Sequence, residues 1–124
     1  MPLPIHVLVV EDDRPIQQYI QTALEDEGYV VTVADNSMTA FELAPAVFPD
    51  LIILDIMMPF VDGQKFLAMF RRAAARPVPV LATSANHTYA QKARQLGAID
   101  FLPKPFSIDE LLDYVRRYTG ALSG

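Results

Sequence analysis

The segment Asp50-Leu51-Ile52-Ile53-Leu54-Asp55 decides the fold class of this chain of 124 residues. Four consecutive apolar residues between two aspartates predict a strand that is buried on both faces, as in a parallel sheet covered by helices. Other short apolar runs recur along the chain, and segments with the apolar spacing of a helix separate them. We therefore predict an α/β fold of five strand–helix units, a (βα)5 pattern, with helices on both faces of the sheet.

Turn and capping residues mark the boundaries of the other elements. Pro15 opens the first helix and Gly28 ends it, Asn36 or Ser37 caps the second helix, and Gly97 follows the fourth. The remaining strands are predicted at 6–10, 29–34, 79–84 and 99–102, and the fourth helix at 88–96.

Three helices carry more specific expectations. Pro45 should kink or shorten the second helix. The last helix begins at Ser107, which can form a capping box with Glu110. The third helix is expected to start at Asp62-Gly63 and to bury Phe66, Leu67 and Phe70. The core face of the last helix is predicted to consist of Ile108, Leu111, Leu112 and Val115.

Composition excludes several classes of function. The chain has no cysteine and two histidines, which excludes disulfides, thiolate metal sites and multi-histidine metal sites. Its net charge of −5 argues against a broad basic surface, so no direct contact with nucleic acid is expected. No apolar run is long enough to span a membrane, and no signal peptide is recognisable. We expect a single cytoplasmic domain over residues 1–124.

Charged and hydroxyl side chains follow four of the predicted strands. They lie in Glu11-Asp12-Asp13, at Asp55, in Thr83-Ser84 and in Pro103-Lys104-Pro105. Because the carboxyl ends of parallel strands meet at one edge of a sheet, which is where such folds bind ligands, we expect these side chains to converge.

Carboxylates from two neighbouring strands repel each other unless a pKa rises or a hard cation binds. Asp12 and Asp55 could ligate Mg²⁺, with Glu11 acting through a water molecule. Lys104 would add a positive charge for a phosphate, and Ser84 a hydroxyl donor. A carboxylate nucleophile, a metal and these donors are what phosphoryl transfer requires.

Each of these features also has a simpler interpretation. The acidic run 11–13 could be a charge cluster that favours the start of a helix. Asp55 could be an ordinary turn residue, Lys104 an exposed loop cation, and Ser84 a cap residue. It is the combination at successive strand ends that favours a phosphoryl-transfer site.

In this order and spacing, the motifs of the chain resemble the receiver domains of two-component response regulators over nearly its whole length. The segments that carry the resemblance are 9–13, 50–59, Asp62-Gly63, Ser84-Ala85 and 97–106. The resemblance implies a flavodoxin-like three-layer α/β/α fold, with a doubly wound parallel sheet in the strand order 2-1-3-4-5.

The resemblance also implies a role for each matching residue. Asp55 would be the phosphoacceptor, and Lys104 the lysine that pairs with the phosphate. Asp12, Asp55 and the backbone carbonyl of Met57 would bind Mg²⁺ directly, with Glu11 as the outer acidic partner. The peptide bond between Lys104 and Pro105 would be cis.

Ser84 and Phe101 are the candidates for a conformational switch. Ser84, rather than Thr83, stands directly before Ala85 and five residues after Pro79, as the family pattern requires. Phe101, three residues before the lysine, is the candidate switch aromatic, although it could equally be a core residue. The segment 84–97 is about two residues shorter than the family pattern, which leaves the start of the fourth helix and the geometry of partners open.

The resemblance implies that a sensor histidine kinase or a histidine phosphotransfer protein donates the phosphoryl group. The chain would catalyse its own phosphorylation and dephosphorylation, and would change the surface formed by its fourth helix, fifth strand and fifth helix. A homodimer through that surface is possible, and the chain could be a stand-alone receiver or part of a larger regulator.

The sequence disfavours three other functions. A Mg²⁺-dependent phosphatase would need a second aspartate where Met57 stands, and a receiver that only binds partners would lack Asp55, Asp12 or Lys104. A nucleotide site is disfavoured because no glycine-rich phosphate loop occurs among the five glycines.

The side chain at position 57 should set the lifetime of the phosphorylated state. The resemblance implies that Met57 and Asn86 tune hydrolysis, and a bulky apolar Met57 should shield the phosphate from water. We predict that Met57→Asn shortens the lifetime several-fold, measured as loss of aspartyl phosphate over time. An unchanged rate would contradict the expectation.

Overall fold

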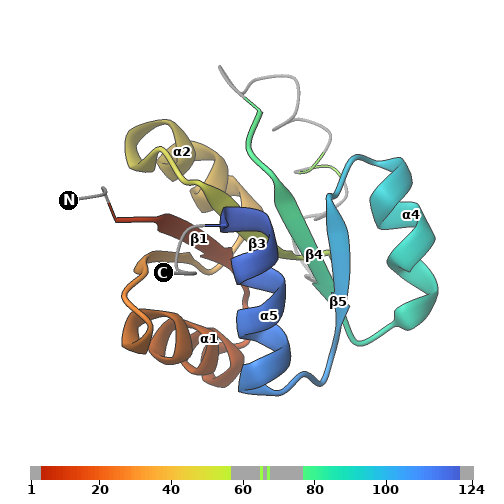
Figure 1. Cartoon of the computed structure of the whole chain (residues 1–124). Helices are drawn as coiled ribbons and strands as arrows, with labels where there is room; N and C mark the ends of the chain where they lie inside the picture. The colour runs from red at the N-terminus through yellow and green to blue at the C-terminus, as the bar shows by residue number, and fades with distance from the viewer. Residues whose placement is uncertain (1–3, 57–64, 66, 68–76, 121–124) are drawn as a thin grey trace.

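The computed structural model describes residues 4–56, 65, 67 and 77–120 and contains a five-stranded parallel sheet (Figure 1). The strand order is β2-β1-β3-β4-β5, as predicted. The strands are β1 (His6–Val10), β2 (Val30–Ala34), β3 (Leu51–Asp55), β4 (Val80–Ser84) and β5 (Asp100–Pro103). Each begins and ends within one residue of its predicted range.

Helices cover both faces of this sheet, which confirms the predicted layers. They are α1 (Arg14–Asp26), α2 (Ser37–Val47), α4 (Ala90–Gln95) and α5 (Ile108–Thr119), with a 3₁₀ turn, η1 (His87–Tyr89), before α4. Helices α1 and α5 lie side by side on one face, and α2 and α4 lie on the other (Figure 1). Of the predicted third helix, the structure describes Lys65 and Leu67, which are both helical, and Leu67 is fully buried as predicted. Asp62, Gly63, Phe66 and Phe70 lie outside the described residues.

The sheet is rigid at its centre because β3 and β4 are buried along their whole length. Alternate side chains of the strands enter two separate cores. Leu8, Ile52 and Leu54 pack on the face of α2 and α4. Val9 and Ile53 pack on the face of α1 and α5. Since a fully buried leucine or isoleucine contributes about 1.5–3 kcal/mol, these central strands hold their carboxyl ends in fixed register.

Side chains cap three helices, and the prediction for the last one is confirmed. Asp13 accepts a hydrogen bond from the backbone amide of Ile16, 3.1 Å away, at the start of α1. Asn36, one of the two predicted candidates, caps α2. Ser107 and Glu110 form the predicted capping box at α5.

The start of the fourth helix differs from the prediction. Asn86 accepts a hydrogen bond from the backbone amide of Thr88, which winds residues 87–89 into a 3₁₀ turn, so that α4 begins only at Ala90. Helix α2 continues through Pro45 and ends two residues later, at Val47.

Ile108 also departs from its predicted place in the core. It is 43% exposed, while Leu111, Leu112 and Val115 are buried. Ile108 is the first residue of α5. Its spacing places it on the same face of the helix as Leu111 and Val115, but at the first position of the helix this face is only partly covered.

Asp100 connects the edge strand β5 to both neighbouring helices. Its carboxylate accepts hydrogen bonds from the Arg94 guanidinium of α4, at 3.0 Å, and from the Tyr118 hydroxyl of α5. Arg117 of α5 approaches to 3.7 Å. Burial acts to raise the pKa of Asp100, but the hydrogen bonds from Tyr118, the Phe101 amide and Arg94 outweigh it and lower the pKa.

Removing the charge of Asp100 should weaken this connection. We predict that Asp100→Asn lowers the free energy of unfolding by about 1.5–3 kcal/mol at neutral pH, the range for hydrogen bonds to a charged group. Because the folded protein holds the pKa of Asp100 low, the stabilisation exists at neutral pH and is lost as the pH falls through the folded pKa. Urea unfolding should therefore show the two proteins converging in acid. Asp113→Asn, an exposed aspartate of α5, is the control; a constant difference at all pH values would contradict the prediction.

Candidate metal and phosphoryl-transfer site

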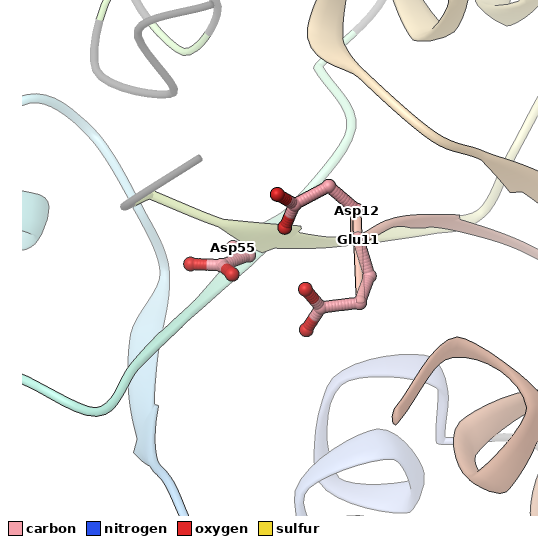
Figure 2. A group of neighbouring side chains, drawn as sticks. All are labelled: Glu11, Asp12 and Asp55. Atoms are coloured by element: carbon pink, nitrogen blue, oxygen red, sulfur yellow. The ribbon is translucent and has the colours of Figure 1, made fainter. Parts of the chain in front are cut away.

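Three carboxylates meet at the carboxyl ends of β1 and β3 (Figure 2). Glu11 and Asp12 directly follow β1, and Asp55 is the last residue of the adjacent β3. Each offers a carboxylate oxygen within 4.8 Å of those of the other two. Glu11 and Asp55 are buried, with 2% and 7% of their surface exposed, whereas Asp12 is exposed. The predicted convergence of these three residues is confirmed.

Lys104 reaches the same site from the loop after β5. Its ammonium nitrogen, Nζ, lies 2.5 Å from Glu11 Oε1 and 3.0 Å from Asp55 Oδ2. The side chain of Lys104 is 13% exposed, so this charge interaction is shielded from solvent. The predicted approach of Lys104 to the carboxylates is confirmed, and the bond between Lys104 and Pro105 is cis.

The buried charges shift each other's protonation. Burial, reinforced by the negative charge of Asp55, raises the pKa of Glu11 to about 7, although Lys104 opposes the shift. For Lys104, burial acts to lower the pKa, but the hydrogen bonds and charges of Glu11 and Asp55 outweigh burial and raise it. Lys104 therefore stays positively charged, and Glu11 gains or loses its proton near neutral pH.

Ser84 and Thr83 end β4 next to the acidic site, and both are buried. Thr83 pairs with Asp55 across the sheet, and Ser84 pairs with Pro103. The hydroxyl oxygen of Ser84 accepts a hydrogen bond from the Asn86 amide, at 2.9 Å, which leaves the hydroxyl hydrogen able to donate.

Phe101 lies in β5 and is 4% exposed, packed in the core beneath α2 and α4. This inward position agrees with both interpretations of the residue, as a switch aromatic in its buried position or as an ordinary core side chain. Its role in switching therefore stays a prediction.

The chemistry of the donors fits Mg²⁺. All three carboxylates supply hard oxygen ligands from two adjacent strands, and the exposed Asp12 leaves one side open to solvent. Met57, whose carbonyl is the other predicted ligand, lies outside the described residues.

Sequence reasoning missed two residues that support Glu11. The side-chain amide of Gln17 is buried and donates to the backbone carbonyl of Glu11, at 2.9 Å, and to Asp35 Oδ1, at 2.9 Å. Asp35 also pairs with Arg14, and the hydrogen bond from Gln17 lowers its pKa. Asp35 directly follows β2, so the same strand-end rule could have found it; a glutamine within a helix gives no comparable signal.

Comparison with known proteins identifies the family. The model of the "Response regulator receiver domain" family matches residues 7–116. This chain belongs to that family. Receiver domains bind Mg²⁺ at an acidic pocket and interact with sensor kinases, and in this receiver the corresponding pocket contains Glu11, Asp12 and Asp55.

Two of the relatives in sequence are named as transcriptional regulatory proteins. The receiver is 42% identical over 112 residues to the "Probable transcriptional regulatory protein SilR" of Salmonella typhimurium, covering 89% of this chain and 49% of that protein. It is 40% identical over 112 residues to the "Transcriptional regulatory protein CusR" of Escherichia coli, with the same coverage of 89% and 49%. The chain thus spans about half the length of the curated relatives it matches.

Solved structures of receivers have the same fold. The "Francisella response regulator 1452 receiver domain" gives a TM-score of 0.85 at 36% identity and covers 94% of this chain and 97% of that one. The chemotaxis protein CheY4 of Vibrio cholerae gives a TM-score of 0.86 at 28% identity, covering 94% and 99%. These likenesses confirm the flavodoxin-like architecture.

Two further predictions concern nucleic acid and the membrane. SilR and CusR are named as transcriptional regulatory proteins, and the expected lack of direct nucleic-acid contact stays a prediction for residues 1–124. Among the residues that the structure describes, no helix is both long and apolar enough to cross a membrane.

The raised pKa of Glu11 predicts how stability depends on pH. Folding favours protonated Glu11, so its contribution is full below the ordinary value of 4.5 and is lost as the pH rises through about 7. In metal-free buffer, the wild type should lose on the order of 1–2 kcal/mol of unfolding free energy between about pH 5 and about pH 8 from this source.

Glu11→Gln should remove most of this loss, as measured by urea unfolding with a chelator present. Glu25→Gln, on the exposed surface of α1, is the control and should keep the wild-type slope. Equal slopes for wild type and Glu11→Gln would show that Glu11 does not titrate in this range.

Proposed function

We propose that the receiver is the phosphoacceptor switch of a two-component system, and that Asp55 accepts the phosphoryl group. The observation that carries the proposal is the position of Asp55 in the site. Its buried carboxylate lies 3.0 Å from the ammonium of Lys104 and within 4.8 Å of two further carboxylates. Asp55 thus has a neutralising cation beside it and acidic neighbours suited to hold a metal ion.

In the proposed step, a carboxylate oxygen of Asp55 attacks the phosphorus of a phosphohistidine on the donor protein. The new O–P bond forms as the N–P bond breaks, and the donor's imidazole keeps the electron pair and takes up a proton. Asp12, Asp55 and Glu11 would hold Mg²⁺, directly or through water, and the bound ion would neutralise the charge on the phosphoryl oxygens.

Lys104 would then exchange partners. In the unphosphorylated receiver its ammonium is shared between Glu11 and Asp55. A phosphoryl group on Asp55 adds negative charge beside it, and Lys104 would form an ion pair with a phosphoryl oxygen. Loss of the interaction with Asp55 is thereby offset within the same site.

Ser84 and Phe101 would transmit the change. The Ser84 hydroxyl would donate its hydrogen to a phosphoryl oxygen, moving the end of β4, and Phe101 would repack in the space this opens. The affected surface is that of α4, β5 and α5, which Asp100 links together. Homodimerisation through this surface is one output that the proposal includes.

An apolar hollow beside the site suits the approach of a donor protein. It has a volume of about 530 Å³ and lies between the start of α1 and the loop after β5. Its lining residues are Pro15, Ile16, Tyr19, Ala85, Lys104, Pro105 and Phe106. A sensor histidine kinase or a histidine phosphotransfer protein could bury an apolar side chain here while placing its phosphohistidine near Lys104.

We propose that residues 1–124 form one cytoplasmic receiver domain, which resets itself by hydrolysing its acyl phosphate. The chain spans about half the length of its curated relatives, and the proposal includes both a stand-alone receiver and a receiver within a larger regulator.

Phosphorylation of the isolated receiver tests the proposal. With Mg²⁺ and a small phosphodonor such as acetyl phosphate, the wild type should gain one acid-stable, base-labile phosphoryl group, detected by intact mass. Asp55→Asn should abolish the labelling, because an amide is not a nucleophile at this site.

Asp50→Asn is the matched control, since Asp50 directly precedes β3 and accepts a hydrogen bond from the His6 amide at the other edge of the sheet. It should label as the wild type does. Labelling of Asp55→Asn at the wild-type rate, or failure of the wild type to label, would refute the proposal.

A further inference from the structure

The backbone of Lys104 is held from both sides, by the last residue of β4 and by the turn that follows this strand. Its amide donates to the carbonyl oxygen of Ser84, at 3.0 Å, and extends the ladder between β4 and β5. Its carbonyl oxygen lies 2.9 Å from Nε2 of the His87 ring. A carbonyl can only accept a hydrogen bond, so His87 carries a proton on Nε2 and donates it.

The turn that presents His87 is itself tied to Ser84. The Asn86 amide donates to the Ser84 hydroxyl oxygen at 2.9 Å, and the Asn86 side-chain oxygen accepts from the Thr88 amide at 3.1 Å and the Thr88 hydroxyl at 2.6 Å. These bonds fix η1 beside the loop after β5. A closed chain of contacts therefore runs from Ser84 through Asn86 and His87 to Lys104 and back to Ser84.

We propose that His87 is a positioning residue for Lys104 in phosphoryl transfer. The inference deepens the proposed function and rests on it. Strand pairing fixes the position of Lys104 only on its amide side, and the His87 ring supplies the second point of attachment. With both points held, the long side chain of Lys104 starts from a fixed backbone, and its ammonium stays 3.0 Å from Asp55.

The hydrogen bond from His87 to the Lys104 carbonyl connects two parts of the site. In the proposed function, Ser84 and Lys104 act on the same phosphoryl group; Ser84 is the last residue of β4, and Lys104 directly follows β5. His87 joins the segments that follow these two strands, outside the strand ladder. A donor of similar reach at position 87, such as glutamine, should preserve the link, whereas alanine should remove it.

The test compares His87→Ala and His87→Gln with the wild type, with Gln91→Ala, an exposed residue of α4, as the control. The initial rate of phosphorylation is measured against acetyl phosphate concentration at saturating Mg²⁺. His87→Ala should lower the maximal rate roughly two- to tenfold, the effect of one hydrogen bond of this kind, and His87→Gln should restore most of it. Thermal unfolding should confirm that all four proteins are folded.

A second measurement needs no phosphoryl group. The ¹³C resonance of the Lys104 carbonyl should move when His87 becomes alanine and stay close to the wild-type position when it becomes glutamine. A carbonyl resonance unchanged in His87→Ala would overturn the inference, as would a His87→Gln variant as slow as His87→Ala. If the wild type accepts no phosphoryl group, the proposed function fails, and the carbonyl resonance still decides whether His87 holds Lys104.

Discussion

The ammonium group of Lys104 between the carboxylates of Glu11 and Asp55 is the interaction on which the site depends. Two buried carboxylates at the ends of adjacent strands would repel each other strongly without it. Lys104 compensates only in part, because one ammonium group faces three carboxylates. The excess of negative charge is one that a divalent cation can neutralise. This charge balance supports the proposal that the site takes up a metal ion and then a phosphoryl group.

The fold supplies this arrangement from ordinary elements. The parallel sheet brings the ends of β1, β3 and β5 to one edge, and the two apolar cores hold those ends in register. Contacts around the site then fix the backbone: Gln17 binds the carbonyl of Glu11, and His87 binds the carbonyl of Lys104.

The sheet and the main site residues could be predicted from the sequence because they depend on local patterns. Buried apolar runs such as 51–54 mark the strands, and acids at strand ends mark the site. The 3₁₀ turn at 87–89 and the exposure of Ile108 could not be predicted, because they depend on hydrogen bonds within one turn and on how far the first position of a helix is covered. Gln17 and His87 were missed for a related reason: each acts through a backbone carbonyl that only the folded chain brings near.

The proposed switch depends on Lys104 exchanging a carboxylate partner for a phosphoryl oxygen. A crystal structure of the receiver with Mg²⁺ and beryllofluoride, a phosphoryl mimic, would show this exchange. We expect beryllofluoride on Asp55, Mg²⁺ bound by Asp12 and Asp55, and Lys104 Nζ within hydrogen-bond distance of a fluoride. Beryllofluoride bound on Asp55 while Lys104 remains paired with Glu11 alone would refute the exchange.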